Sequence, residues 1–334
     1  MATTLAINGF GRVGRTTLRR LLDTNSELEL VAVNDLAGIE NLAYLLEFDT
    51  TYGRLKQDVQ VHDDVLVVGD KAIKVYQEAD AKNLPWGELQ IDIVLEATGI
   101  YKTADKAQVH LDAGAKRVII TAPADPETKM IVYGVNEGII TNDDLIISSA
   151  SCTTNDLAPV AKVLHDNFGI VTGYMTAVKA YTPSQKLHDS PNKDMRRGRA
   201  GAMNAIPTST GAAKSIGRVI PELTGIIDGS ALRVPLLGGA IVEFYTNLEK
   251  KVTIEEVNAA MKEAANPSFE YTEKPIVSSD VIGTSAGGIF DATLTEVVEN
   301  GDKQLVKTVS WYDSEYGYAS NLVRLSEHFA KIIK

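Results

Sequence analysis

Cysteine is nearly absent from this chain, which has one cysteine, Cys152, among 334 residues. A lone thiol cannot form an intramolecular disulfide, and it cannot supply the several thiolates of a structural metal site. The sequence therefore predicts a fold without disulfides and without a bound metal. An isolated cysteine is either a buried structural thiol or a reactive one, and its neighbours in the sequence have to decide between the two.

Long hydrophobic runs and an excess of positive charge are also missing. No apolar run reaches the ~18 residues that span a bilayer, and the first residues lack the basic segment of a secretory signal. The net charge of −11 argues against a general nucleic-acid partner. The basic cluster Arg196–Arg199 is interpreted as a solvated or interface segment. We expect a cytoplasmic protein without membrane or nucleic-acid partners.

The length and composition suit two globular domains, with 44% hydrophobic and 23% charged residues. Near the start, an apolar strand leads into Gly9-Phe10-Gly11-Arg12-Val13-Gly14 and then a helical pattern. In this context the G-x-G-x-x-G glycines allow a tight turn and close approach of the backbone to a pyrophosphate. A second strand ends at Asp35, about 20 residues further on, where an acid bonds the adenine ribose. Because a carboxylate there repels a 2′-phosphate, we predict NAD.

Two more apolar strands, at residues 91–97 and 118–122, alternate with a helical stretch at 103–113. Strands that alternate with helices predict a doubly wound, parallel sheet. Thr98, Gly99 and Thr121 follow the carboxyl ends of these strands, where folds of this kind bind their ligands.

The surroundings of Cys152 favour a reactive thiol. Residues 144–150 have the pattern of a strand, and apolar residues recur at helical spacing from Leu157 to Leu164. A cysteine at the point where a strand turns into a helix lies near the positive end of the helix dipole and near free backbone N–H groups. Both favour the thiolate, which is the nucleophilic form.

After Cys152 the pattern changes to longer strands, at 171–181, 240–249, 289–298 and 305–312, and helical stretches at 202–219 (broken by Pro207) and 253–265. We predict an α/β Rossmann-type, doubly wound nucleotide-binding domain over residues 1–151 and an α+β catalytic domain with a mostly antiparallel sheet over residues 152–317. The last helix, 318–334, is expected to pack back on the first domain.

Seven segments carry a resemblance to a known family: Asn8–Gly14, Asn34-Asp35, Glu96–Gly99, Ser151-Cys152-Thr153-Thr154-Asn155, Pro207–Lys214, Leu232–Pro235 and Trp311–Asp313. The chain resembles the phosphorylating glyceraldehyde-3-phosphate dehydrogenases over essentially its whole length. The resemblance implies that the Cys152 thiolate attacks the aldehyde of glyceraldehyde 3-phosphate and that a hydride passes to NAD. A thioester remains on Cys152, and inorganic phosphate then releases 1,3-bisphosphoglycerate.

The resemblance also assigns the site residues. Thr182 and Arg233 are expected to hold the substrate phosphate, and Ser151, Thr153, Thr210 and Gly211 the attacking phosphate. The predicted cofactor-binding residues are Gly9, Gly11, Arg12, Val13, Gly14, Asp35, Thr98, Gly99, Thr121 and Ser314. A homotetramer is expected, with residues 182–199 at an interface between subunits.

Three residues depart from the family pattern. Lys179 occupies the position of the family's catalytic histidine, which acts as the general base. An ammonium can pair with a thiolate and donate to an oxyanion, but with a reference pKa of ~10.4 it is a poor proton acceptor. Ser314 replaces the asparagine that holds the nicotinamide carboxamide. Asp156 is expected to add negative charge near the thiol.

Three functions remain open on these grounds. The first is the family's phosphorylating dehydrogenase in glycolysis or gluconeogenesis, slowed by Lys179. The second is an NAD-binding protein with little dehydrogenase activity, which Lys179 and Ser314 favour. The third is a dehydrogenase of a related phosphorylated aldehyde such as erythrose 4-phosphate, because Thr182 and Arg233 suit any aldehyde that ends in a phosphate.

Overall fold

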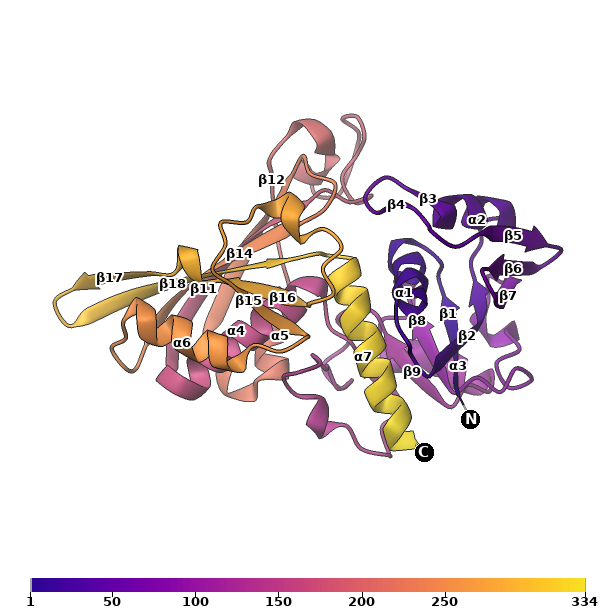
Figure 1. The fold of residues 1–334 in the computed structure, drawn as a ribbon, viewed down its shortest axis with the longest axis horizontal. Helices are drawn as coiled ribbons and strands as arrows, with labels where there is room; N and C mark the ends of the chain where they lie inside the picture. Colours follow the sequence, from indigo (N-terminus) through magenta and orange to yellow (C-terminus); the bar gives the residue numbers. More distant parts are fainter. Residues whose placement is uncertain (1, 334) are drawn as a thin grey trace. The chain divides into compact units, whose positions relative to one another are not determined.

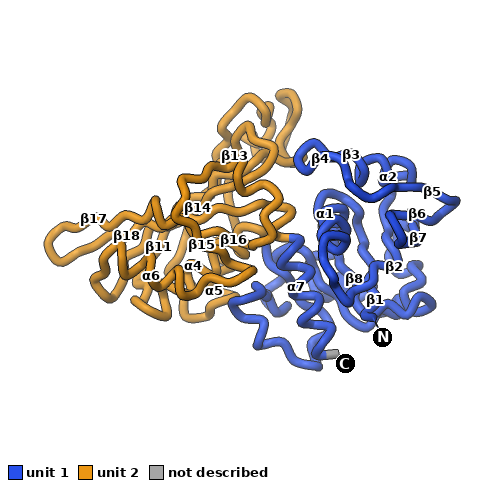
Figure 2. Tube along the Cα trace, viewed as in Figure 1, with its two compact units in different colours: residues 1–151, 319–334 blue, residues 152–318 orange. Residues whose placement is uncertain are grey.

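The computed structural model describes residues 2–333 and their side chains as far as residue 332. The chain divides into two compact units, residues 1–151 with 319–334 and residues 152–318, which are coloured separately in Figure 2. Each unit is built around its own sheet, and each is described below by itself. No helix of the described residues is long and apolar enough to cross a membrane.

The first unit contains an eight-stranded sheet in the order β10-β9-β8-β1-β2-β7-β6-β5, with β1 near its middle (Figure 1). Its six strands from β10 to β7 are parallel, and β6 and β5 add an antiparallel edge. The elements are β1 Thr3–Asn8, α1 Arg12–Leu22, β2 Leu28–Asn34, α2 Ile39–Glu47, β3 Phe48–Asp49, β4 Gly53–Arg54, β5 Val59–His62, β6 Val65–Val68, β7 Lys71–Tyr76, β8 Ile93–Glu96, α3 Ala104–Asp112, β9 Arg117–Ile120, β10 Ile146–Ser148 and, from Ala319 onward, α7 Tyr316–Ile333.

Both faces of this sheet are buried, as the uninterrupted apolar runs of its strands require. Leu5 and Ile7 of β1 lie in a core that α1, α2 and α7 complete, with Phe329 of α7 fully buried in it. Ala6, between them in β1, belongs to a second core on the opposite face with Trp86. Because these strands are parallel, the loops after β1, β2, β8, β9 and β10 gather at one edge of the sheet. The predicted cofactor residues of this unit lie in those loops or in the first turn of α1, which follows the loop after β1.

The second unit contains a mixed, largely antiparallel sheet in the order β12-β13-β11-β14-β18-β16-β15, with β17 paired to β18. Helix α4 packs against β11, β14, β16 and β18 and against α5 and α6. Its predicted apolar face is confirmed, because Leu157, Val160, Ala161 and Leu164 are all buried. The elements are α4 Cys152–Phe168, β11 Ile170–Ala180, β12 Ile206–Thr208, α5 Ala212–Val219, β13 Ile227–Val234, β14 Ala240–Leu248, α6 Ile254–Ala264, β15 Phe269–Thr272, β16 Gly288–Asp291, β17 Glu296–Asn300 and β18 Lys303–Tyr312.

The fold class predicted from the sequence is confirmed, but two element predictions in the second unit are wrong. The helical stretch expected over 202–219 is α-helical only from Ala212, after a 3₁₀ turn at Gly201–Met203, and Pro207 lies in strand β12. Strand β12 is an edge strand of the sheet, and an edge strand tolerates proline, which has no backbone N–H to donate. The strand expected over 289–298 is two strands, β16 and β17, separated by a 3₁₀ turn at Ala292–Leu294 in which the Asp291 carboxylate accepts the N–H of Thr293.

Candidate active site

The glycine loop after β1 packs against the turn after β8 with no room for a side chain. Gly9 has a φ of +98°, and a Cβ there would lie 2.6 Å from the backbone nitrogen of Thr98. A Cβ on Gly14 would lie 2.5 Å from the carbonyl oxygen of Gly9. Gly11 precedes α1, so the amino end of that helix, where an anion is favoured, lies at this loop. Only glycine fits at positions 9 and 14, as a dinucleotide-binding turn requires.

A pocket of about 260 Å³ opens beside this loop, lined by the ends of β1, β2 and β8. Asp35 lies in its wall, where the carboxylate accepts the N–H of Phe10 at 2.8 Å and that of Ala37 at 3.0 Å. The carboxylate is therefore fixed at the pocket, as predicted, and it also braces the glycine loop. A concave pocket with apolar walls, one oriented carboxylate and a side-chain-free turn fits the adenosine half of NAD.

The predicted cofactor residues fall into two groups. Gly9, Gly11, Asp35 and Thr98 line this pocket. Arg12 is instead paired with the Asp49 carboxylate and stacks on the Tyr52 ring. The hydroxyl of Thr121 donates to the Glu96 carbonyl at 2.9 Å, at the end of β9. Val13 and Gly14 belong to the first turns of α1, and Gly99 follows Thr98 with a φ of +72°. Ser314, in the second unit, is half-buried at the start of α7.

Cys152 is the first residue of α4 and is half-buried. Two residues before it, Ala150 has a φ of +59°, a left-handed conformation that costs a non-glycine residue free energy. The strand-to-helix turn predicted from the sequence is thus present, with a strained residue in it. The thiol is presented at the amino end of a helix, where backbone N–H groups and the helix dipole favour a negative charge.

Lys179 lies on the buried face of β11, eight per cent exposed, and belongs to the same site. Its ammonium donates to the Thr153 hydroxyl at 2.6 Å, and Thr153 directly follows Cys152. Thr153 is the one hydrogen-bond partner of Lys179 among the described residues. Burial lowers the pKa of Lys179 below its ordinary value of 10.5, the positive charges of Arg233 and Arg197 lower it further, and Cys152 opposes the shift.

The Thr153 hydroxyl also shares a 2.8 Å hydrogen bond with the phenol of Tyr312. Tyr312 is fully buried at the end of β18, and burial raises its pKa well above 10.0, so it remains a neutral phenol. A chain of hydrogen bonds therefore runs from Lys179 through Thr153 to Tyr312. It comes from three elements, β11, α4 and β18, and it fixes the ammonium beside the residue after the nucleophile.

Arg233 stands next to Lys179 on the neighbouring strand. The two residues are register partners in the parallel pair of β11 and β13, and Arg233 donates to the Ala180 carbonyl at 2.8 Å. Arg197 donates to the Thr208 hydroxyl at 2.8 Å and has the Asp194 carboxylate at 3.4 Å. Two arginines thus lie within electrostatic range of the Lys179 ammonium, and a cluster of positive side chains suits phosphate anions.

The other predicted phosphate ligands lie in loops of the second unit, except Ser151, which is the last residue of the first unit before Cys152. Thr182 follows β11, and its hydroxyl bonds Ser184 at 2.8 Å. Thr210 accepts the N–H of Ala212 at 3.2 Å, and Gly211 caps α5 without a side-chain bond. Ser151 is half-buried immediately before Cys152. For these four residues, contact with a phosphate remains a prediction.

Asp156 corrects one expectation from the sequence. Its side chain is fully buried in α4, and burial raises its pKa from 3.8 to about 8, opposed by a 2.7 Å hydrogen bond from Ser310. Its second oxygen, Oδ1, is buried without a hydrogen-bond partner among the described residues. Asp156 is therefore mostly neutral at pH 7 and does not add the negative charge that the sequence predicted. Among the described residues, no charged side chain contributes to this shift, and the sequence gives no sign of the burial that causes it.

The family model for the NAD-binding domain of glyceraldehyde 3-phosphate dehydrogenase matches residues 3–104, and the model for its C-terminal domain matches residues 151–314. The chain belongs to the glyceraldehyde 3-phosphate dehydrogenase family. It is therefore an NAD-dependent oxidoreductase by family.

Full-length relatives agree with this membership. The chain is 54% identical to a glyceraldehyde-3-phosphate dehydrogenase of Clostridium pasteurianum over 334 residues, which covers 99% of this chain and all of the relative. It is 52% identical to the enzyme of that name in Clostridium acetobutylicum, with 99% of both chains covered. The identity is also 52% to the one in Lactobacillus delbrueckii subsp. bulgaricus, with 99% of this chain and all of the relative covered.

Within this family, two parts of the site were missed by sequence reasoning. Arg197 was interpreted as part of a solvated or interface segment, but it is half-buried and lies within electrostatic range of Lys179. Tyr312 was recognised only as part of a family motif, without a role. The sequence contains a sign that Tyr312 is buried, because this residue ends a strand with alternating polarity, on its apolar side. Nothing in the sequence distinguishes Arg197 from the two arginines beside it.

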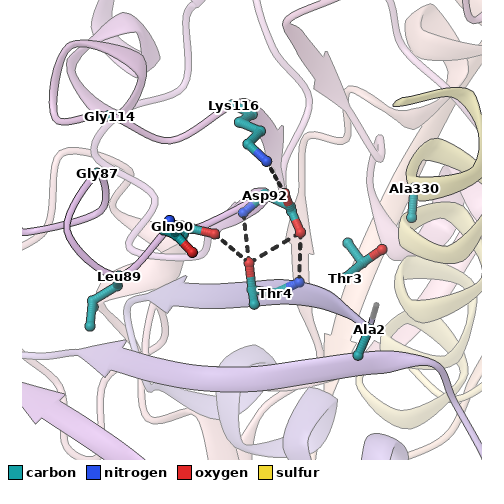
Figure 3. A pocket seen from close by; sticks show the side chains of 10 residues that line it. All are labelled: Ala2, Thr3, Thr4, Gly87, Leu89, Gln90, Asp92, Gly114, Lys116 and Ala330. Carbon is teal, nitrogen blue, oxygen red and sulfur yellow. Dashed lines mark hydrogen bonds and ion pairs between the residues drawn. The ribbon is translucent and has the colours of Figure 1, made fainter. Parts of the chain in front are cut away.

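A second hollow, of about 580 Å³, lies at the amino-terminal edge of the first sheet, far along β1 and β8 from the cofactor loops (Figure 3). Its polar groups satisfy one another. Asp92 accepts from the Thr4 N–H at 2.9 Å and from Lys116 at 2.7 Å, and the Thr4 hydroxyl donates to the Gln90 carbonyl at 2.6 Å. This hollow therefore offers few unused polar groups to a ligand. Among the described residues, no group of three or more His, Cys, Asp or Glu side chains is placed to hold a metal ion.

Proposed function

We propose that this chain oxidises glyceraldehyde 3-phosphate with NAD and inorganic phosphate, through a thioester on Cys152, and that Lys179 makes the hydride-transfer step slow at neutral pH. The observation that carries the proposal is the buried Lys179 ammonium, which is hydrogen-bonded to Thr153 beside the nucleophile. The names of the relatives and the retained cysteine support the reaction class.

In the first step the Cys152 sulfur forms a bond to the aldehyde carbon, and the carbonyl oxygen becomes an oxyanion. The Lys179 ammonium, with the positive charges of Arg233 and Arg197 nearby, is suited to stabilise that oxyanion. This step uses the charged form of Lys179, which is an advantage of the substitution. A thiohemiacetal forms when the oxyanion takes up a proton.

In the second step the hydroxyl proton of the thiohemiacetal has to leave as the carbon becomes a thioester. NAD, when bound, accepts the hydride. The chain must supply a proton acceptor, and the neutral amine of Lys179 is the candidate. Burial lowers the pKa of Lys179 from 10.5, which favours the neutral amine more than in an exposed lysine, but an amine is intrinsically a slower acceptor near neutral pH than the imidazole it replaces. General-base help is typically worth ~10²–10⁴-fold, so we expect this step to be slowed within that range.

In the last step an oxygen of inorganic phosphate forms a bond to the thioester carbon, and the carbon–sulfur bond breaks to release the acyl phosphate and the Cys152 thiolate. We propose that Thr182 and Arg233 hold the substrate phosphate and that Ser151, Thr153, Thr210 and Gly211 hold the attacking phosphate. Arg197 is added to these ligands, because its guanidinium points to Thr208 and shares the electrostatic environment of Lys179.

The test is to trap the covalent intermediate. The protein is mixed with NAD and glyceraldehyde 3-phosphate without inorganic phosphate, quenched in acid and analysed by mass spectrometry. An acyl group on Cys152, released by later addition of phosphate, is the expected result, and the Cys152→Ser variant should not accumulate it. Full NAD binding without any acylation, even after long incubation, would instead support an NAD-binding protein with little dehydrogenase activity. Erythrose 4-phosphate, run in parallel, tests the substrate.

A further inference from the structure

A buried polar network lies behind the wall of the NAD pocket, in the first unit. It consists of Asn8, Trp86, Glu96 and His110, each at most two per cent exposed, and we call it the Glu96 network. Asn8 donates to Glu96 Oε2 at 2.7 Å, His110 Nε2 lies 3.0 Å from the same oxygen, and Trp86 donates to His110 Nδ1 at 3.2 Å. Four polar side chains buried together in this way call for an explanation.

The contacts fix the proton on His110. An indole N–H can only donate, so Nδ1 of His110 has to accept from Trp86. The ring proton then sits on Nε2 and is donated to the Glu96 carboxylate. The other carboxylate oxygen, Oε1, accepts the backbone N–H of Thr98 at 2.9 Å and the Thr98 hydroxyl. Both oxygens of Glu96 are therefore saturated with donors, and none of these donors is a lysine or an arginine.

The network reaches three loops of the cofactor pocket. Asn8 accepts from Asn34 at 2.8 Å, and Asn34 accepts the N–H of Glu78 at 2.8 Å, so the ends of β1 and β2 are joined. Glu96 joins the end of β8 to these through Asn8 and shapes the Thr98 turn. Asn8, Asn34, Glu78 and Thr98 line the pocket, whereas Glu96, His110 and Trp86 do not.

We propose that Glu96 and His110 are positioning residues for NAD. They act through Asn8 and Thr98, which they hold in the conformation that the pocket needs before the cofactor arrives. A site whose loops are ordered in advance loses less conformational entropy on binding, so the benefit appears as affinity. The proposal concerns cofactor binding and does not depend on the substrate or on the role of Lys179.

The test compares two substitutions of one residue. In His110→Gln, the amide nitrogen can occupy the place of Nε2 and still donate to Glu96. In His110→Asn, the shorter amide can replace only Nδ1, so the bond to Glu96 is lost. Calorimetric titration of the full-length variants with NAD should give a Kd raised roughly three- to tenfold for His110→Asn and within about twofold of the parent for His110→Gln.

Glu96→Gln is the second variant, and it is decisive if His110→Asn fails to fold. It replaces one accepting oxygen by an amide nitrogen, which cannot accept the hydrogen bonds that this oxygen receives. The substitution should raise the NAD Kd about tenfold or more. Leu66→Ala, in β6 of the same unit and fully buried, is the control for general destabilisation. It should lower the melting temperature and leave the Kd unchanged. The NMR signal of the Trp86 indole N–H, which donates to His110 in the parent, should shift in His110→Asn and not in Leu66→Ala.

The proposal is overturned if a folded His110→Asn or Glu96→Gln protein binds NAD with the parent's affinity. It is equally overturned if Leu66→Ala weakens NAD binding as much as these variants do at a similar loss of melting temperature, because the effect would then be general destabilisation.

Discussion

The ammonium of Lys179 donates a 2.6 Å hydrogen bond to the hydroxyl of Thr153, the residue that follows Cys152. Thr153 in turn is bonded to the buried phenol of Tyr312. On our proposal Lys179 takes the place of the family's general base, and these hydrogen bonds hold its ammonium in the site. The account predicts a site that is assembled for covalent chemistry and slow in proton transfer.

Lys179→His should speed hydride transfer at neutral pH. An imidazole with a reference pKa of ~6.5 is largely in its accepting form at pH 7, whereas an amine is not. We expect an increase of ~10²-fold or more in the single-turnover rate of NADH formation without phosphate. Lys179→Gln, which keeps polarity without a titratable group, is the control and should be no faster than the parent. A Lys179→His protein that is no faster than its parent contradicts the proposed role.

The stability of the protein should respond to Lys179→Met with a defined pH dependence. The folded-state pKa of Lys179 is lowered by burial, while the unfolded chain keeps the ordinary value of 10.5. Below the lowered pKa the folded protein carries the full cost of a buried ammonium, and this cost is relieved as the pH rises toward 10.5. Lys179→Met should therefore stabilise most at low pH, with a gain that shrinks as the pH rises through the lowered pKa toward 10.5. Melting temperatures across the range test this, and a gain that grows with pH would refute it.

Asp156→Asn should remove a pH dependence of the opposite sign. The folded pKa of Asp156 is raised to about 8 from 3.8, so the folded state keeps a proton that the unfolded chain has lost. The contribution of Asp156 to the parent's free energy of unfolding therefore falls as the pH rises from about 4 to about 8, by up to about 1.4 kcal/mol per pH unit. Denaturant titrations near pH 5 and pH 8 should show parent and variant diverging, with the variant favoured at the higher pH. Parallel curves would mean that Asp156 is ionised in the folded protein.

Predictions from sequence can single out residues whose positions depend on local spacing. Gly9, Gly14 and Asp35 could be identified because a dinucleotide turn needs glycine at fixed places and an acid after the next strand. The predictions are wrong where the burial of a side chain, or its place at a sheet edge, determines its charge or its secondary structure. Asp156 reads as a surface charge on a helix, yet it is fully buried beside Ser310, and the two residues are 154 positions apart in the chain. Pro207 reads as a helix break, yet it lies in a strand at the sheet's edge, which the sequence does not mark as an edge.

The buried network behind the cofactor pocket was missed for a related reason. In the sequence Glu96 stands out only as part of a family segment, and no pattern marks His110. They lie 14 residues apart on a strand and a helix. Their contact depends on how α3 packs on the sheet, and no periodic pattern reports that. Lys179, in contrast, could be placed in the site because a family motif brackets it.

Thr153→Val should move the pH dependence of hydride transfer to lower pH. The hydrogen bond to Thr153 stabilises the charged form of Lys179, so its loss lowers the Lys179 pKa further. Tyr312→Phe, which removes only the second bond of the Thr153 hydroxyl, should shift the profile less. The rates are measured in single turnovers without phosphate, because Thr153 is also a proposed phosphate ligand. If the pH profile of hydride transfer were the same in Thr153→Val as in the parent, Lys179 would not be the group that accepts the proton.

The central claim is that Lys179 serves as a slow base, and the most direct test is a single-turnover burst of NADH from about pH 6 to about pH 10, without phosphate, for the parent and Lys179→His side by side. The account predicts a burst near one per subunit in both proteins, a parent rate that rises steeply toward alkaline pH, and a Lys179→His rate that is already high near pH 7. A parent rate that is independent of pH, or equal to that of Lys179→His at pH 7, would contradict it.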